Sequence, residues 1–270
     1  MAVRWVDRVP TNPNRMKITP ENGSSYFATV ERADNPTVAG TPVNAQNLNA
    51  MQEASGLTAN RSVYVSTAGS DSVGDGSEAN PYATINKALA SIPRNLNGYT
   101  AIVYIAAGSY AENVSVRDFG NGLIRLSGVA GAVVEVNGVT FNRVTYAEIA
   151  NITFSITGSN LYANASNVRI ESPFIANGGT FGVYANHGSC LVFLNTVTIN
   201  NTTNFAVVSS SLSNVYVTTL AGSNNKMSVS CTLGGVCVLG SDAMTSSGAQ
   251  YFTDTGGRIL AGSQVQIPNY

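Results

Sequence analysis

The sequence predicts an all-β protein whose larger part is a parallel β-helix of about eight stacked coils. Three observations support this. The chain is poor in charge, with 11% charged residues, and rich in turn formers, with 26 glycines. A short apolar triplet recurs every 21 to 24 residues. Finally, the outer members of each triplet are uniformly aliphatic, whereas the middle members vary.

The composition excludes several broad classes of protein. Disordered chains combine low hydrophobicity with high net charge, but here 44% of residues are hydrophobic and the formal net charge is −1. A nearly neutral chain has no field that would attract nucleic acid. No run of 18 apolar residues is present, so we expect no membrane insertion. The first residues, MAVRWVDRVPTNP, lack the apolar segment of a signal peptide.

The repeat consists of two aliphatic residues around a variable one. The triplets are residues 103–105, 124–126, 147–149, 168–170, 192–194, 215–217 and 236–238, with a less regular turn near 259. Side chains alternate across a strand, so the flanking residues should point inward and the middle ones outward. The predicted outward column is Tyr104, Arg125, Glu148, Arg169, Phe193, Tyr216 and Cys237.

Further apolar stretches, such as 114–116 and 197–199, complete each repeat. Two or three strands in a turn of about 22 residues are typical of a β-helix. A leucine-rich repeat has a similar period but requires fixed Leu and Asn positions, which this chain lacks. A propeller blade requires about 40 residues.

Three regions follow from the pattern: an arm at 1–60, an opening strand, loop and capping helix at 61–101, and the β-helix proper at 102–270. The capping helix is expected because an open solenoid end exposes core and strand edges. Asn80 is a candidate N-cap with Pro81 at the first helical position. Apolar residues follow at helical spacing, namely Ile85, Ala88, Leu89 and Ile92.

Residues 63–116 resemble the opening of pectin-lyase-like right-handed β-helix proteins. The residues that carry the resemblance are Pro81, Tyr82, Thr84, Ile85, Tyr104, Gly108, Tyr110 and Glu112. The resemblance implies a right-handed single-stranded parallel β-helix. It says little about activity, because the family includes polysaccharide lyases, hydrolases, phage tail spikes and inert structural rods.

The arm resembles the N-terminal module of phage and prophage tail or virion appendage proteins. The matching residues are Arg8, Val9, Pro10, Pro13, Arg15, Lys17, Thr19, Pro20, Ala33, Asp34, Pro36, Gly40, Thr41, Pro42, Asn44 and Leu48. The resemblance implies virion attachment to tail, baseplate or capsid proteins through Arg8, Pro10, Pro13, Arg15, Lys17, Pro20, Asp34, Pro36 and Pro42. The prolines predict an extended arm, followed by a short helix capped by Thr41. A loosely ordered leader is the alternative.

Together these features predict a structural phage protein located in the virion and assembled in the host cytoplasm. It would be a fibre, spike or decoration protein used in adhesion to the host surface. Such rods are usually homotrimers, and Tyr104, Phe193 and Tyr216 are candidates for subunit or receptor contact. Two alternatives remain open: a tail-spike depolymerase that cleaves host glycans by lyase or hydrolase chemistry, and a carbohydrate-binding adhesin without catalysis.

The positions of the carboxylates favour the hypothesis of a structural protein over that of an enzyme, because acid–base chemistry on sugars requires a converging pair. The β-helix has only Glu112, Asp118, Glu135, Glu148, Glu171, Asp242 and Asp254. Arg125, Glu148 and Arg169 should form an exposed charge ladder on adjacent coils. Glu112 and Glu135 remain a minor candidate for a glycosidase pair. We therefore expect no catalytic residue, metal or cofactor.

Two other groups have ordinary interpretations. The loop at 69–76 spaces its aspartates somewhat like a calcium loop but lacks the remaining ligands, so a turn-rich loop is favoured. The three cysteines, Cys190, Cys231 and Cys237, are odd in number and irregularly spaced, which predicts buried free thiols. His187 near Cys190 has no evident third partner for nucleophilic or metal chemistry.

Overall fold

The computed structural model describes residues 15–18, 26–29, 56–157, 161–171, 173–248 and 250–261. The chain divides into two compact units, Met1–Ser55 and Gly56–Tyr270. In the first unit, β1 (Arg15–Ile18) pairs antiparallel with β2 (Tyr26–Thr29). This pairing was not expected from the prolines of the arm. The helix predicted after Thr41 lies outside the described residues.

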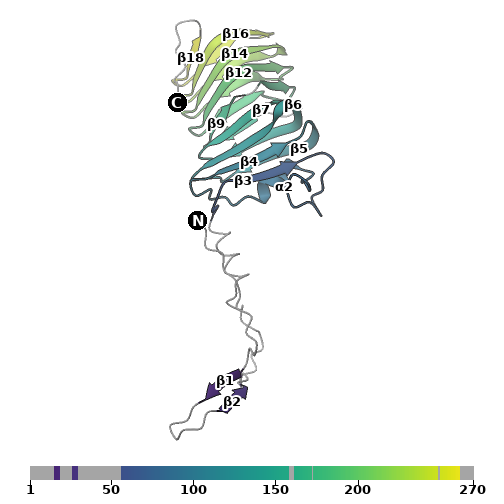
Figure 1. Ribbon diagram of the computed structural model, residues 1–270. Coiled ribbons are helices and arrows are strands. Elements are labelled where there is room, and N and C mark those ends of the chain that lie inside the picture. The colour runs from purple at the N-terminus through teal and green to yellow at the C-terminus, as the bar shows by residue number, and fades with distance from the viewer. Residues whose placement is uncertain are drawn as a thin grey trace, which may run out of the picture. The chain divides into compact units, whose positions relative to one another are not determined.

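The second unit is a parallel β-solenoid, which confirms the predicted fold (Figure 1). After the opening strand β3 (Arg61–Val65) and the helix α2 (Ile85–Ala90), strands follow one another without further helix in the described residues. Their bounds are β4 (Thr100–Ile105), β5 (Gly108–Arg117), β6 (Leu123–Asn142), β7 (Ala147–Thr157), β8 (Leu161–Asn164), β9 (Asn167–Ile170), β10 (Phe174–Asn177), β11 (Val183–Asn186), β12 (Cys190–Asn200), β13 (Phe205–Ser209), β14 (Asn214–Asn225), β15 (Met227–Cys231), β16 (Val236–Ser246), β17 (Tyr251–Thr253) and β18 (Arg258–Ala261).

The strands stack in three faces. The first face holds β3, β4, the start of β6, the start of β7, β9 and the first parts of β12, β14 and β16, and ends with β18. The second face contains β10 between the later parts of β7 and β12. The third face runs through β8, β11, β13, β15 and β17. Long strands such as β12 and β14 bend from one face to the next, and register shifts mark the bends.

The solenoid has about six turns, fewer than the eight expected from the repeat. The last triplet region, β18, stands at the end of the first face, and the residues that follow it lie outside the description.

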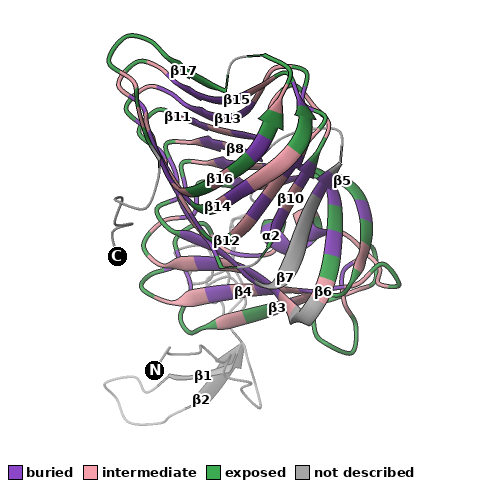
Figure 2. Ribbon diagram, turned by 90° about the horizontal axis from the view of Figure 1, so that it is seen from above, coloured by how far each residue is buried: buried purple, intermediate pink, exposed green. Residues whose placement is uncertain are grey.

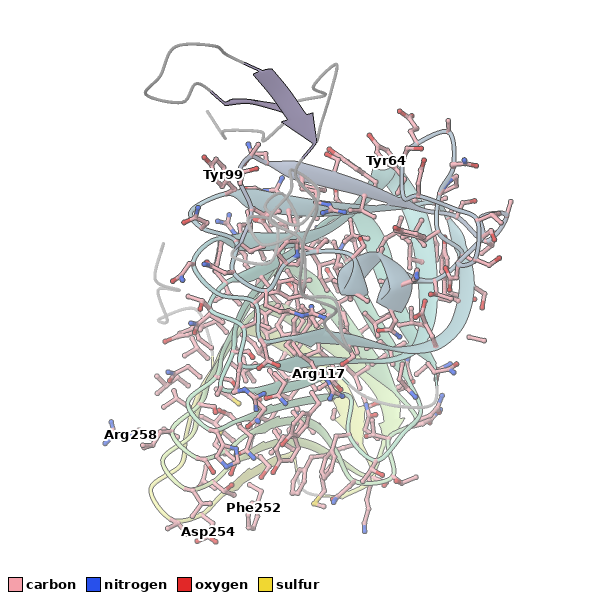
Figure 3. The ribbon with its side chains drawn as sticks, turned by 90° about the horizontal axis from the view of Figure 1, so that it is seen from below. Tyr64, Tyr99, Arg117, Phe252, Asp254 and Arg258 are labelled. Atoms are coloured by element: carbon pink, nitrogen blue, oxygen red, sulfur yellow. The ribbon has the colours of Figure 1, made fainter. Side chains whose placement is uncertain are left out.

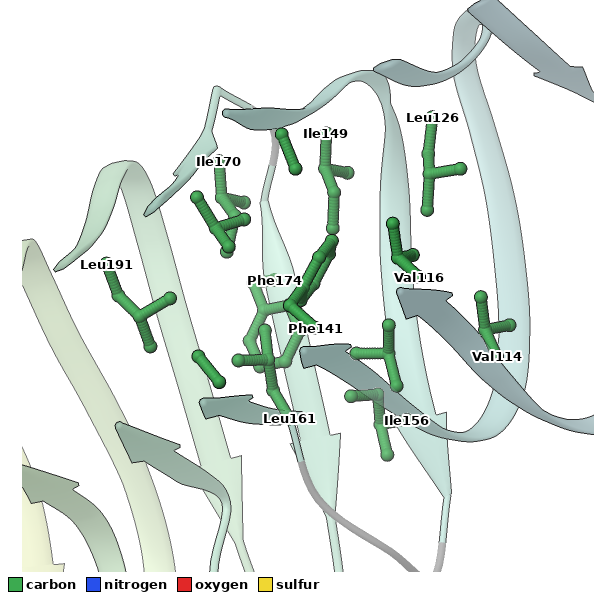
Figure 4. Packing of buried hydrophobic residues seen from close by; sticks show 14 of the residues in the cluster. Val114, Val116, Leu126, Phe141, Ile149, Ile156, Leu161, Ile170, Phe174 and Leu191 are labelled. Carbon is green, nitrogen blue, oxygen red and sulfur yellow. The ribbon is translucent and has the colours of Figure 1, made fainter. Parts of the chain in front are cut away.

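The core consists of columns of inward side chains that continue from coil to coil. Leu126, Ile149 and Ile170 form one such column on the first face, and each is at most 1% exposed (Figure 4). Across the interior, Phe174 of the second face contacts Phe193 of the first, with ring centroids 5.5 Å apart. Buried and exposed residues alternate along the strands, as Figure 2 shows, so period-two patterning is the physical basis of the fold.

The predicted orientation was wrong at two residues of the outward column. Phe193 is 1% exposed and Cys237 is fully buried. Strand pairing aligns Arg169 with Val192 and Tyr216 with Val238, so Val192 and Val238 continue the outward column. Val238 is nevertheless only 5% exposed. Runs of consecutive apolar residues fit either register by pattern alone, and pairing with the preceding coil decides between them.

Tyr104 also belongs to a different column from Arg125. It pairs with Tyr64 on one side and Ser127 on the other, while Ile102 pairs with Arg125. The corrected outward column is therefore Ile102, Arg125, Glu148, Arg169, Val192, Tyr216, Val238 and Leu260.

Candidate functional surfaces of the solenoid

The helix α2 begins later than predicted. Its N-cap is Thr84, whose hydroxyl accepts the N–H of Lys87, rather than Asn80. The helix does not begin before Tyr82 because Tyr82 bridges Val65 and bonds on both sides to the backbone of Tyr64 and Ser66. The predicted apolar face is confirmed, since Ile85, Ala88, Leu89 and Ile92 are all buried.

Glu112 is the second capping group of this helix. Its two carboxylate oxygens accept the backbone N–H groups of Ile85 at 2.7 Å and Asn86 at 3.0 Å. The Asn86 side chain in turn bonds the backbone of Asn113 and Ser115 in β5. A carboxylate at a helix N-terminus satisfies orphan donors and the local dipole. The motif residue Glu112 therefore joins the first coil to α2.

The loop at 66–80 supplies a third capping carboxylate. Asp71 accepts the N–H groups of Ala83 and Thr84 and the hydroxyl of Thr84. Burial acts to raise the pKa of Asp71, but these hydrogen bonds outweigh it and the pKa lies below its ordinary value. Gly74 is required for close approach, because a Cβ there would lie 2.2 Å from the carbonyl oxygen of Ser70.

Both aspartates of the same loop accept hydrogen bonds from the backbone. The Asp71 carboxylate is occupied as described, and Asp75 accepts the N–H of Ser77 at 2.8 Å. Within the described residues, no group of three or more His, Cys, Asp or Glu is arranged to hold a metal. The loop's geometry thus serves helix capping.

The predicted charge ladder exists in register but differs in its contacts. Arg125, Glu148 and Arg169 are direct neighbours on successive coils. Glu148 is only 4% exposed and is paired with Arg125 through both Nε and Nη2. Arg169 forms its ion pair with Glu171 at 2.8 Å. The ladder is therefore a partly buried pair beside an exposed one, rather than an exposed run of three.

Beyond Arg169 the same outward column becomes apolar, with Val192, Tyr216, Val238 and Leu260 in sequence. Leu260 is 46% exposed, and Leu194 beside this column is 41% exposed. Of the predicted contact residues, Tyr216 lies in this apolar stripe. Tyr104 lies near the other end and stacks on Tyr64 at 5.0 Å, and Phe193 is in the core.

The third face carries an aromatic cluster that the triplet pattern did not reveal. Tyr162 and Tyr184 pair across β8 and β11, and their rings stack at 5.4 Å. Phe181 meets Tyr184 edge-on at 5.1 Å. The Asn186 amide reaches the hydroxyl of Tyr162 at 3.4 Å. The spacing of 22 residues between the two tyrosines is the sequence signal that identifies the pair.

Glu112 and Glu135 are not brought together as a pair by the register. Glu135 is exposed and lies opposite Ser109. Glu112 falls at the register shift between Tyr110 and Asn113, where its carboxylate binds α2. Burial, with Glu112 nearby, raises the pKa of Tyr110 to about 12, and its hydroxyl donates to the carbonyl of Ala106.

Another group that the triplet pattern did not reveal is a buried ladder of serines. Ser166, Ser189 and Ser213 occupy the corner before the first face on successive coils and are at most 1% exposed. The N–H of Ser166 donates to the Ser189 hydroxyl, and the N–H of Ser189 donates to the Ser213 hydroxyl, each at 3.1 Å. Their spacing of 23 and 24 residues identifies them as structural repeats.

The cysteines are free, as predicted, with Cys231 and Cys237 buried and Cys190 half-buried. Burial raises the pKa of both Cys190 and Cys237. His187 is exposed in the turn before β12. No helix of the described residues has the length and apolarity needed to cross a membrane.

Of the predicted attachment residues, only Arg15 and Lys17 lie in a described element, the strand β1. The others, Arg8, Pro10, Pro13, Pro20, Asp34, Pro36 and Pro42, lie outside the described residues. No protein-family model, curated protein or solved structure matches this chain.

Proposed function

We propose that the chain is a structural protein of a bacteriophage virion, a β-helical fibre, spike or decoration protein. Residues 1–60 anchor it to tail, baseplate or capsid proteins, and the solenoid projects as a rod used in host adhesion. The parallel β-solenoid is compatible with this role. The phage assignment itself rests on the resemblance of the arm.

The observation that favours a scaffold is the use of the carboxylates. Five of the seven predicted on the solenoid have structural partners: Glu112 with α2, Asp118 with Arg143, Glu148 with Arg125, Glu171 with Arg169, and Asp242 with Tyr251. Carboxylates engaged in this way are not poised as an acid and a base on either side of a sugar.

The test is made on particles. Virions released from the bacterium that carries the gene should contain the chain by mass spectrometry and bind gold-labelled antibody at a discrete position. Deleting residues 2–60 should remove the chain from particles while the solenoid still folds by circular dichroism. Absence of the full chain from purified particles would refute the proposal.

A depolymerase is the competing function. Purified full chain incubated with host capsule or wall polysaccharide should release no reducing ends and no unsaturated product. Release that disappears in Glu112→Gln or Glu135→Gln would replace the structural assignment with an enzymatic one.

Glycan binding without catalysis is favoured by the Tyr162–Tyr184 cluster, since aromatic rings offer an apolar face with polar edges. Retention on immobilised host polysaccharide should fall in a Tyr162→Ala/Tyr184→Ala variant. The matched control is Tyr64→Ala/Tyr104→Ala, which removes the other stacked tyrosine pair. Equal retention by both variants would exclude this surface.

We also propose a homotrimer, with subunits meeting along the exposed part of the apolar stripe, at Val192, Tyr216 and Leu260 with Leu194 beside them. Light scattering should give three times the chain mass of 28.1 kDa, and Leu194→Asp with Leu260→Asp should lower it. A monomeric wild-type chain at micromolar concentration would contradict the trimer.

A further inference from the structure

At the last described rung of the solenoid, polar side chains take the positions at which two hydrophobic columns of the core would continue. On the second face, Val197 pairs with Leu220, which pairs with Asp242. Val197 and Leu220 are fully buried inward residues. The register therefore places a carboxylate at the position where the next aliphatic side chain of the core column is expected.

The third face ends similarly. Val207 pairs with Val229, which pairs with Tyr251. Both valines are fully buried, whereas Tyr251 is 44% exposed. The Tyr251 hydroxyl donates to Asp242 Oδ2 at 2.7 Å, and the Gln250 amide reaches the same oxygen at 3.3 Å. A polar bridge thus joins two faces across the end of the core.

The other Asp242 oxygen accepts the N–H of Met244 at 2.9 Å, so both carboxylate oxygens are engaged. Burial and the neighbouring Asp242 raise the pKa of Tyr251 to about 12. The hydroxyl therefore keeps its proton at neutral pH and remains the donor of the bridge.

The two ends of the solenoid contrast. At the first coil, α2 covers the core with Ile85, Ala88 and Leu89. At the last rung, β17 and β18 terminate the order of paired strands, and all of β17 is exposed. Figure 3 shows Phe252, Asp254 and Arg258 on one side of the unit, away from Tyr64 and Tyr99. Among the described residues nothing pairs with the outer edges of β17 and β18, and unpaired parallel edges are a template for another copy.

We propose that the Asp242–Tyr251 bridge is a polar end cap that prevents two copies of this chain from joining through their last rungs. A second rung stacked on this end would bury the Asp242 carboxylate away from water, which is strongly unfavourable without a cationic partner. Inward-pointing charges are one of the devices by which β-proteins protect open edges.

The proposal predicts the geometry of the association that the cap prevents. Because α2 covers the core at the opposite end, the contact would join two last rungs and would be symmetric and closed. Loss of the cap should therefore double the mass of the wild-type species and not produce long filaments.

The test is sedimentation velocity of the full chain from about 1 to 100 μM, a range in which weak self-association becomes visible. Asp242→Leu continues the aliphatic column and should double the mass as concentration rises. Asp254→Leu, which removes the same charge from the exposed turn at the same end, should leave the mass unchanged. Asp242→Asn should associate at higher concentration than Asp242→Leu.

Circular dichroism verifies that each variant is folded, and Asp242→Asn carries the test if Asp242→Leu fails to fold. Wild-type mass in the folded Asp242 variants would overturn the proposal. Equal association of Asp254→Leu would also overturn it, because general loss of charge would then be the cause. Filaments in place of a doubled species would refute the symmetric contact.

Discussion

The Glu112 carboxylate accepts the backbone N–H of Ile85 at 2.7 Å across 27 residues of sequence. This bond fixes the start of α2 to the first coil of the solenoid. Its partner bond to Asn86, at 3.0 Å, leaves neither carboxylate oxygen idle. Glu112, a minor candidate for a glycosidase pair by its sequence position, is thus part of the cap that closes one end of the core.

Replacing Glu112 by Ala should lower the free energy of unfolding by about 2 kcal/mol, since two charge-assisted bonds to a helix N-terminus are lost. Glu135→Ala should change it by less than about 0.5 kcal/mol, because Glu135 is exposed. Urea unfolding followed by circular dichroism measures both. Equal effects would contradict the capping role.

Breaking the partly buried Arg125–Glu148 ion pair should lower the free energy of unfolding more than breaking the exposed Arg143–Asp118 pair. Arg125→Gln leaves Glu148, whose side chain is 5% exposed, without its cation, and should cost about 3 kcal/mol. Arg143→Gln removes the partner of Asp118 in a pair 64% and 44% exposed, and should cost less than about 1 kcal/mol. The order of the two unfolding midpoints decides the matter, and a reversed order would refute the burial argument.

The register correction at β12 predicts opposite outcomes at adjacent residues. Phe193→Ala should destabilise the solenoid by about 4 kcal/mol, because it empties a site packed against Phe174. Leu194→Ala, at a side chain 41% exposed, should cost less than about 1 kcal/mol. Thermal unfolding of the two variants checks this. A larger effect at Leu194 would restore the register inferred from the triplets.

Acid should weaken the cap through Asp71. Its pKa in the folded chain lies below the ordinary value of 3.8, so its contribution is present above that value and is lost as the pH falls through the folded pKa. Asp71→Asn should therefore be less stable than wild type at pH 6, and the difference should shrink below pH ~4. Unfolding midpoints between about pH 3 and 6 measure it. A difference independent of pH would show that the charge is not involved.

Much of the fold was predictable because every coil has to bury one side of its short strands, and the sequence repeats the same pattern each time. The inward members of the early triplets, such as Ile124, Leu126, Ile149 and Ile170, are buried as predicted. The prediction failed where several apolar residues follow one another, as at Phe193 and Cys237. In such a run the sequence pattern does not show which side chains point into the core. It also failed at Asn80, which has a favourable N-cap sequence. Tyr82 instead forms backbone hydrogen bonds with Tyr64 and Ser66, so the helix begins after it.

The sequence alone determined the class of fold and its period, because burying one face of every short strand forces alternation that recurs with each coil. It also marked the residues around Glu112 as special without saying why. Only the tertiary structure decided which oxygen meets which donor, since Glu112 and Ile85 are neighbours only after the chain has turned. The same holds for Asp242 and Tyr251, whose unremarkable positions become the end of two core columns only when the coils are stacked in register.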